Sequence, residues 1–304
     1  MSTALFTGFL KLLRPRQWIK NLVCLGGAFF AGRIFDFHAD ARACLAAGAF
    51  CAAASFVYII NDILDRDRDR NHSRKKLRPI ASGQVSVAQA IAFSLPVAAI
   101  AVGLGARLGP GVLGILAAYA VLNICYSAVL KNLSLVDATV VAAGFILRIY
   151  AGTVAVGVIP SAWLLLCTFF LSLFLAFAKR RAELNAVSGD PGADSLAVDV
   201  TATRAVLHKY NVTILDRFCN VCATLTIAAY AIFTILGHAN RSLIITTPPV
   251  VMGVFRYLLL VERFHEGEAP ETILARDWAV QLAIVIWAVL YVAVLYYGLR
   301  IDVQ

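Results

Sequence analysis

The chain has 304 residues, of which 61% are hydrophobic, and its formal net charge is +9. A mean hydropathy of +0.79 is too apolar for a soluble domain of this length, so a soluble globular protein is excluded. The basic residues cluster between apolar runs, which indicates membrane orientation and anionic lipid head groups rather than nucleic acid. The sequence therefore predicts one polytopic all-α membrane domain, residues 1–304.

The N-terminal residues 1–17 lack the pattern of a cleavable signal peptide. The apolar run from Ala4 to Leu13 is short, and Arg14-Pro15-Arg16 follows it where small residues would precede a cleavage site. We expect an amphipathic helix that lies on the membrane surface.

Nine apolar runs each approach the ~20 residues that cross a ~30 Å hydrocarbon core. They cover residues 18–35, 43–60, 87–108, 111–130, 135–156, 162–178, 212–236, 243–261 and 278–299. Most Lys and Arg residues lie on one side of these spans, which the positive-inside rule assigns to the cytoplasm. The pattern predicts a multi-pass protein of the inner (plasma) membrane. Its N-terminus and its two long polar loops, 61–86 and 179–210, would face the cytoplasm and carry the catalytic groups.

A row of acidic residues ends the second span and is the most specific pattern in the chain. Asn61, Asp62, Asp65 and Asp69 fall on one stripe of a helix that advances about 100° per residue. Carboxylates are costly at the mouth of a span, and Mg²⁺ binds carboxylates together with substrate phosphates. All four residues are candidate metal ligands, and the three aspartates are also candidate catalytic residues. The alternative is a solvated helix end whose carboxylates pair with the neighbouring arginines.

Basic residues follow this acidic row and suit phosphate oxygens. Pro79 fixes the chain among them and Gly83 permits an unusual backbone. The candidates for binding substrate phosphate here are Arg74, Lys75, Lys76, Arg78 and Ser82. The alternative is that these cations only anchor the next span.

The fourth and fifth spans add three candidates. Tyr126 is a candidate phosphate ligand and Lys131 a candidate catalytic residue, although Lys131 also fits a membrane anchor. Arg148 lies inside the fifth span on the face of Asp137, about 16 Å farther along the axis. A cation within a span indicates a functional site, so Arg148 is a catalytic candidate. Its alternative is a structural partner for a polar group on a neighbouring helix.

A second basic run, Lys179, Arg180 and Arg181, leaves the sixth span and suits phosphate, as does Tyr210 farther on. An i,i+4 pair between Lys179 and Glu183 is the alternative, an ordinary helix surface. The spacing of Asp190 and Asp194 is like that of a second acidic motif, but the Pro191-Gly192 between them indicates a turn.

Together these motifs resemble the UbiA superfamily of intramembrane prenyltransferases. The match is carried by Asn61-Asp62-x-x-Asp65-x-x-x-Asp69, Arg78-Pro79-Ile80-Ala81-Ser82-Gly83, and Tyr126-Ser127-x-x-Leu130-Lys131 with Asp137. The run from Leu13 to Asn21, which adds Lys20 as a candidate phosphate ligand, resembles the branch of decaprenyl-phosphate phosphoribosyltransferases. The resemblance implies nine transmembrane helices around a central cavity open to the cytosol, with Mg²⁺, or Mn²⁺ in its place, held by the aspartates.

One departure from the superfamily bears on the substrate. Typical prenyl-diphosphate users carry a second Asp-rich motif after the sixth span, where this chain has Lys179-Arg180-Arg181. The resemblance then implies transfer of 5-phosphoribose from 5-phosphoribosyl diphosphate to a polyprenyl (decaprenyl) phosphate, with release of diphosphate. The product would be a pentose precursor for cell-wall arabinan, as in arabinogalactan.

Two other functions compete with this one. Transfer of a prenyl group to a 4-hydroxybenzoate-type acceptor in quinone synthesis is the alternative enzyme activity. Transport is the third, and acidic residues at a cytosolic mouth rather than in mid-span disfavour it. The expected partners are the bilayer, the lipid phosphate and the sugar donor, and a homo-oligomer is compatible with them.

Overall fold

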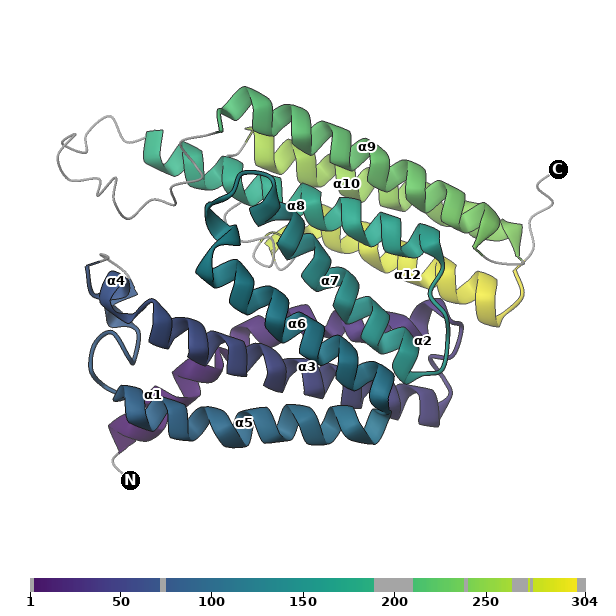
Figure 1. The fold of residues 1–304 in the computed structure, drawn as a ribbon. Coiled ribbons are helices and arrows are strands. Elements are labelled where there is room, and N and C mark those ends of the chain that lie inside the picture. The colour runs from purple at the N-terminus through teal and green to yellow at the C-terminus, as the bar shows by residue number, and fades with distance from the viewer. Residues whose placement is uncertain are drawn as a thin grey trace. The chain divides into compact units, whose positions relative to one another are not determined.

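The computed structural model describes residues 3–71, 75–188, 210–237, 240–263 and 276–299, together with Ile273. All regular structure in these ranges is helical (Figure 1). Eight helices there are long and apolar enough to cross a membrane. They are α3 (Phe37–Leu64), α5 (Val87–Leu108), α6 (Pro110–Ala128), α7 (Val136–Ala155), α8 (Ala162–Ser188), α9 (Val212–Leu236), η6 (Arg241–Thr246) continued by α10 (Thr247–Arg263), and α12 (Trp278–Tyr296). The prediction of an all-α polytopic membrane protein is confirmed.

The described residues hold eight candidate spans where about nine were expected, and the expected first span, 18–35, is the one that is not among them. The chain here forms the 3-10 helix η1 (Pro15–Leu25) and the short α2 (Gly26–Phe30) instead of one long α-helix. A Cβ at Gly27 would collide with the backbone of Gly152 on α7, and one at Gly152 would collide with the carbonyl of Cys24. Small residues thus let two backbones touch, as they do between membrane helices, and this contact holds the segment in place.

The described residues group into two compact units. Unit 1 contains residues 3–71, 75–131 and 147–159, and unit 2 contains 132–146, 160–188, 210–237, 240–263 and 276–299. Helix α7 contributes its first half to unit 2 and its second half to unit 1. The single-domain organisation stays a prediction.

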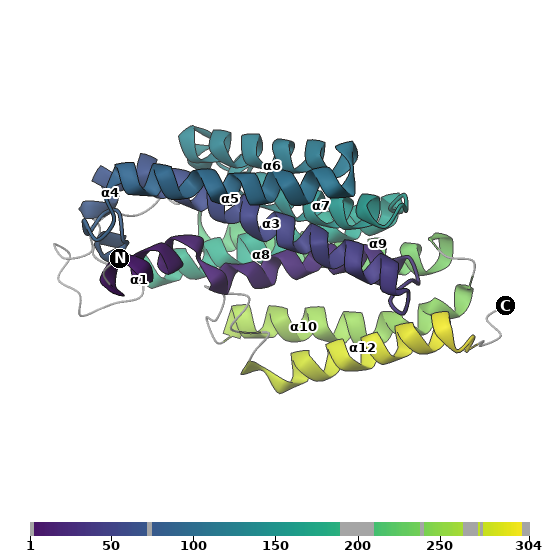
Figure 2. The same ribbon diagram turned by 90° about the horizontal axis from the view of Figure 1, so that it is seen from below.

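Unit 1 is built around α3, which packs against α5, α6 and η1 (Figures 1 and 2). In its core the rings of Phe50 and Tyr119 meet edge to face at 5.2 Å. At the end of this unit where α5 and α7 finish, Arg42 donates to the carbonyls of Ala155 (2.5 Å) and Leu108 (3.1 Å). These bonds satisfy carbonyls that a helix C-terminus leaves without partners, which gives this arginine a structural role.

Helix α1 (Thr3–Leu13) is the expected amphipathic N-terminal helix. Leu12 is fully buried in a cluster with Ile59 and Ile80, whereas Phe6 and Leu10 are exposed. The helix therefore packs on the end of α3 where the acidic row begins, and it leaves an apolar stripe uncovered. Its position on the membrane surface stays a prediction.

Unit 2 contains α8 and α9 packed along each other, and α10 and α12 packed as a second pair (Figures 1 and 2). Its core includes Phe174 and Tyr257, whose rings meet edge to face at 5.3 Å. Trp287 Nε1 donates to the Tyr230 hydroxyl at 2.6 Å, and that hydroxyl lies 2.6 Å from Thr246 Oγ1. Polar atoms inside this helical unit are thus paired with one another, as burial in an apolar environment requires.

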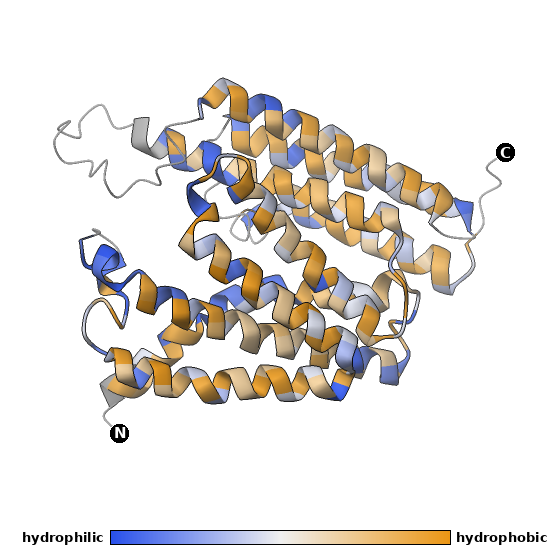
Figure 3. Ribbon diagram, in the orientation of Figure 1, coloured by the Kyte–Doolittle hydropathy of each residue, from blue (hydrophilic) through white to orange (hydrophobic). Residues whose placement is uncertain are grey.

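Two helices run beyond the predicted spans. Helix α3 continues to Leu64, so the acidic row begins on the helix itself. Helix α8 continues to Ser188, and the basic run that was expected to open a loop is helical instead. Figure 3 shows hydrophilic residues gathered on α4 (Arg66–Arg70) and at the adjoining end of α3. The polar residues that follow the second span therefore lie on helices, at the end of α3 and on α4.

Candidate functional site

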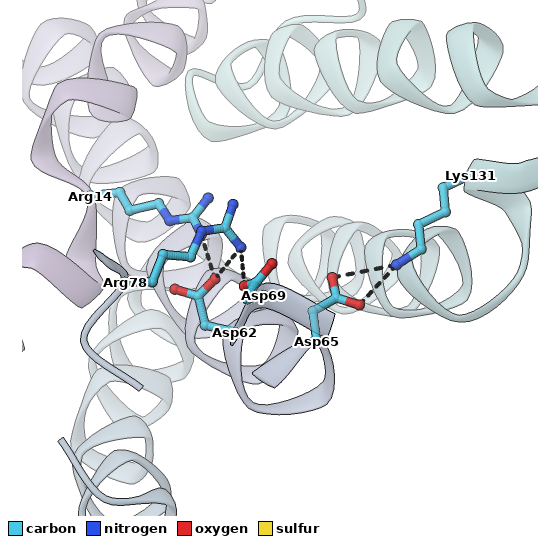
Figure 4. Close-up of polar contacts among 6 residues, drawn as sticks. All are labelled: Arg14, Asp62, Asp65, Asp69, Arg78 and Lys131. Atoms are coloured by element: carbon cyan, nitrogen blue, oxygen red, sulfur yellow. Dashed lines mark hydrogen bonds and ion pairs between the residues drawn. The ribbon is translucent and has the colours of Figure 1, made fainter. Parts of the chain in front are cut away.

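The acidic row is divided by a break at the end of α3. Asp65 leaves helical geometry (φ −89°, ψ 4°) and α4 follows it. The Asp69 N–H still donates to the Asp65 carbonyl at 2.8 Å, which keeps the turn closed. Asp62 and Asp69, seven residues or about two turns apart, lie side by side and are each 3% exposed (Figure 4).

Arg78 joins these two carboxylates. Its Nη1 donates to Asp62 Oδ1 at 3.0 Å and to Asp69 Oδ2 at 2.7 Å. The residue lies directly after the 3-10 turn η2 (Lys75–Leu77), in a compact loop that the Ser82 N–H closes on the Arg78 carbonyl. Its side chain is 29% exposed, so the bridging guanidinium is within reach of a ligand from solvent.

Arg14 supplies a second guanidinium to the same carboxylate. Its Nη2 lies 2.5 Å from Asp62 Oδ1, the oxygen that Arg78 also contacts, and its guanidinium lies 4.8 Å from the centre of the Tyr58 ring. Arg14 has a left-handed backbone (φ 51°, ψ 58°), which separates α1 from η1. Pro15 disfavours α-helical geometry at the residue before it, so α1 does not continue through Arg14.

Asp65 points away from this pair and toward Lys131 (Figure 4). Lys131 Nζ lies 3.0 Å from Asp65 Oδ1 and 3.4 Å from Oδ2. The three aspartates thus do not converge, and no group of three or more Asp, Glu, His or Cys side chains is poised around one point in the described ranges. The expectation that three carboxylates share one stripe holds for Asp62 and Asp69 and is wrong for Asp65, because the helix breaks there.

The residues present nevertheless fit a divalent cation. Asn61 Oδ1 is buried, and no described residue supplies a hydrogen-bond partner for it. Asn61 precedes Asp62 in the chain, and a buried carbonyl oxygen without a donor is a ligand of the kind that hard cations such as Mg²⁺ prefer. Arg14, Arg78 and Lys131 neutralise the three carboxylates in this structure. The donor set suits Mg²⁺ once the guanidiniums have another anion to bind.

The remaining candidates of the first polar loop surround this site. Lys75 is half-buried, and Lys76 and Ser82 are exposed. Gly83 has a left-handed backbone (φ 80°), which a residue without a Cβ permits. Arg74 lies outside the described residues, as do Asp190, Asp194 and Asp199 of the second loop.

Arg148 occupies a different place in unit 1. Its Nε donates to Asn21 Oδ1 at 2.8 Å and its Nη2 donates to the Tyr119 hydroxyl at 3.0 Å, next to the ring of Phe50. Phe50 precedes Asp62 by twelve residues on α3, which is about 18 Å along a helix. The catalytic assignment of Arg148 receives no support from this position, and the structural alternative fits it. Lys20 on η1 and Tyr126 on α6 are half-buried.

The second basic run lies in unit 2, where two of its members form buried ion pairs. Arg180 Nε donates to Asp137 Oδ2 at 2.7 Å, and both side chains are at most 3% exposed. Arg181 donates to Asp216 and to the Val261 carbonyl. These contacts favour a structural role for both arginines, and a phosphate role for Lys179 stays a prediction.

Tyr210 completes the cluster around Asp137. Its hydroxyl accepts the Leu135 N–H at 2.6 Å and lies 3.4 Å from Asp137 Oδ1. Burial raises the pKa of the Tyr210 phenol, so this hydroxyl stays protonated at neutral pH. Tyr210 therefore acts as a neutral hydrogen-bonding group that positions the start of α7.

Sequence reasoning missed Arg14 as a site residue, together with the groups that hold it. Ser55 Oγ, which is fully buried, donates to the Leu13 carbonyl at 2.8 Å, and Trp18 Nε1 lies 3.2 Å from that carbonyl. The available signal was an arginine before a proline at the end of an amphipathic helix on the predicted cytosolic side. Nothing in that local pattern identifies Asp62 as its partner.

Comparison with known proteins shows the family of this chain. The model of the UbiA prenyltransferase family matches residues 21–275. The decaprenyl-phosphate phosphoribosyltransferase of Corynebacterium glutamicum is 31% identical over 95% of this chain and 87% of its own length. The protein of that name in Mycobacterium tuberculosis is 32% identical over 93% of this chain and 92% of its own.

Comparison with solved structures shows which fold this chain shares. The structure of a UbiA homolog from Archaeoglobus fulgidus, bound to GPP and Mg²⁺, superposes with a TM-score of 0.70 at 20% identity, over 95% of this chain and 99% of that one. At that identity the likeness shows the shared helical architecture. The family match over most of the sequence shows more, and the chain belongs to the UbiA prenyltransferase family of membrane transferases.

Proposed function

We propose that this protein transfers 5-phosphoribose from 5-phosphoribosyl diphosphate to a polyprenyl phosphate and releases diphosphate. The observation that carries the proposal is the match of 31–32% identity, over 93–95% of the chain, to proteins named decaprenyl-phosphate phosphoribosyltransferase. The oxygen ligands and the cations at the end of α3 in unit 1 supply the chemistry that a metal diphosphate needs.

The leaving group is the diphosphate on the anomeric carbon of the donor. Asn61, Asp62 and Asp69 would hold Mg²⁺, which when bound lowers the charge of the departing diphosphate. Arg78 and Lys131 are 29% and 20% exposed, so each can turn from its carboxylate to a phosphate oxygen. The half-buried Lys75 and the exposed Lys76 extend this positive surface.

The acceptor is an oxygen of the lipid phosphate. It attacks the anomeric carbon, forming the new C–O bond while the bond to the diphosphate oxygen breaks. Because the attacking oxygen is already anionic, the reaction requires no strong general base. Catalysis then rests on positioning the two substrates and on stabilising the charge that develops on the diphosphate.

The proposal also places the reaction at the cytoplasmic face of the plasma membrane. The basic residues of the polar loops support this orientation through the positive-inside rule. A single Cys placed at position 189 in a Cys-free background should react with an impermeant thiol reagent in inverted vesicles only. Labelling of intact cells would reverse the orientation.

The test of function is a reconstituted assay with purified protein. Radiolabelled phosphoribosyl diphosphate, decaprenyl phosphate and Mg²⁺ should give a charged glycolipid and one diphosphate per product, and EDTA should abolish both. Geranyl diphosphate with 4-hydroxybenzoate should give no product. If the aromatic acceptor is prenylated and the sugar donor is ignored, the protein is an aromatic prenyltransferase instead.

A further inference from the structure

Two guanidiniums share one carboxylate oxygen at the site. Arg14 Nη2 and Arg78 Nη1 lie 2.5 Å and 3.0 Å from Asp62 Oδ1. Arg78 also reaches Asp69, whereas Arg14 contacts the carboxylate of Asp62. The carboxylate is 3% exposed, and Coulomb interactions are stronger there than in bulk water. A divalent cation that arrives by itself would therefore meet an oxygen already neutralised by Arg14.

Hydrogen bonds to the backbone directly before Arg14 fix the position from which its side chain reaches that oxygen. Three polar groups meet beside it: Ser55 Oγ donates to the Leu13 carbonyl at 2.8 Å, and Trp18 Nε1 lies 3.1 Å from Ser55 Oγ and 3.2 Å from the same carbonyl. Ser55 precedes Asp62 by seven residues, about two turns, on the same face of α3. Helix α3 thus carries both Asp62 and the hydroxyl that fixes the start of the Arg14 side chain.

The exposure of the Arg14 side chain indicates that its guanidinium can move to another anion. The Arg14 side chain is 27% exposed and stacks on Tyr58, so its guanidinium can move while its backbone stays fixed. A diphosphate offers it a more highly charged acceptor than one carboxylate. The same guanidinium would then oppose a cation bound without diphosphate and assist a cation bound with diphosphate.

We propose that Arg14, positioned by Ser55 and Trp18, couples the two ligands of this site, so that the divalent cation binds well only together with a diphosphate. The coupling prevents the site from filling with free metal before the donor arrives. It deepens the proposed function but depends only on the diphosphate, which every donor considered for this protein carries.

The experiment measures the two ligands separately on purified full-length protein. Binding of Mn²⁺ alone is followed by the loss of the free-ion EPR signal, and binding of [³²P]pyrophosphate at saturating Mn²⁺ is followed by equilibrium dialysis. Arg14→Gln should bind Mn²⁺ alone about tenfold more tightly and pyrophosphate about 10- to 100-fold more weakly, the range expected for one charge-assisted contact. The opposite signs of the two changes are the distinguishing result.

Three further variants control the result. Ser55→Ala keeps Arg14 but removes the donor to the Leu13 carbonyl, so it should shift both measurements in the same directions by smaller factors, and Ser55→Thr should restore wild-type values. Arg16→Gln removes an exposed cation two residues away and should change neither measurement. Thermal unfolding of each variant confirms that the protein is folded.

Two kinds of result would overturn the coupling. Arg14→Gln that weakens both ligands, or leaves both unchanged, overturns the coupling, and so does an equal effect from Arg16→Gln. Neither measurement contains a sugar or a lipid, so a wrong donor assignment would leave the expected result intact. Failure of the glycolipid assay and failure of the coupling are therefore distinguishable.

Discussion

Two helix ends in this protein carry the same kinds of charged residue in opposite settings. At the end of α3 the carboxylates of Asp62 and Asp69 are buried, while the Arg14 and Arg78 side chains that neutralise them are 27% and 29% exposed. Near the end of α8 both members of the Arg180–Asp137 pair are buried, at 3% and 0%. Cations that reach solvent can exchange one anion for another, whereas a cation enclosed with its carboxylate is part of the packing.

A run of basic residues does not by itself identify a phosphate-binding site. Arg78 and Arg180 were both candidates for binding substrate phosphate, because both lie in basic clusters on the predicted cytosolic side. Their exposure differs about tenfold, at 29% and 3%. We therefore expect substitutions at the first end to change catalysis and substitutions at the second to change folding.

The largest effect is expected from Asp62→Asn. The change removes the charge that holds a divalent cation, so kcat/KM should fall by at least about 100-fold in the glycolipid assay. Thermal unfolding in detergent should shift little, because Arg14 and Arg78 can turn to solvent. Full turnover in this variant would contradict the metal assignment, and Asp67→Asn, on an exposed carboxylate, is the matched control.

The second largest effect is expected from Arg180→Met, which should lower the free energy of unfolding. It leaves the buried Asp137 carboxylate without its cation, which costs about 3–5 kcal/mol. Scanning fluorimetry should show a large fall in the unfolding temperature, and the double change Arg180→Met with Asp137→Leu should recover most of it. A stable single variant with a raised KM for the sugar donor would instead restore the phosphate-binding interpretation.

A smaller effect is expected from Lys131→Ala. Lys131 and Asp65 are 20% and 30% exposed, so loss of the pair should change stability by less than about 1 kcal/mol. The KM for the diphosphate donor should rise about tenfold if Lys131 turns to phosphate. Lys131→Arg keeps the charge and should retain most of the affinity. An unchanged KM in the Ala variant would leave Lys131 as a membrane anchor.

The smallest effect is a pH dependence at a third pair, in unit 2. Arg256 binds Asp277 through Nε and Nη2, and these hydrogen bonds lower the pKa of the Asp277 carboxyl, which also caps α12. A depressed pKa means that the stabilisation is present above the ordinary carboxyl pKa and is lost as pH falls through the lowered value. Asp277→Asn should remove this part of the acid dependence in thermal unfolding. An identical acid profile in the variant would show that the pair contributes nothing.

The sequence by itself determined the properties that depend on neighbouring residues. Hydropathy located the spans, and two of them, α5 at Val87–Leu108 and α9 at Val212–Leu236, match the predicted bounds. The acidic row was expected on one helix stripe, and the carboxylates of Asp62 and Asp69 do lie side by side. The glycine at position 83 permits an unusual backbone, and the residue has a φ of 80°. Each of these properties is periodic or local and can be seen in a short window.

Only the tertiary structure decided which charges meet. Arg14 contacts Asp62 across 48 positions, Lys131 contacts Asp65 across 66, and Arg148 contacts Asn21 across 127. The close backbone approach of Gly27 to Gly152 likewise joins two segments that are remote in sequence. Such pairings depend on how helices pack, and packing is set by the shapes of surfaces that are remote in sequence. The partners and the burial of each charged residue are therefore set by the tertiary structure, and neither can be read from the local pattern.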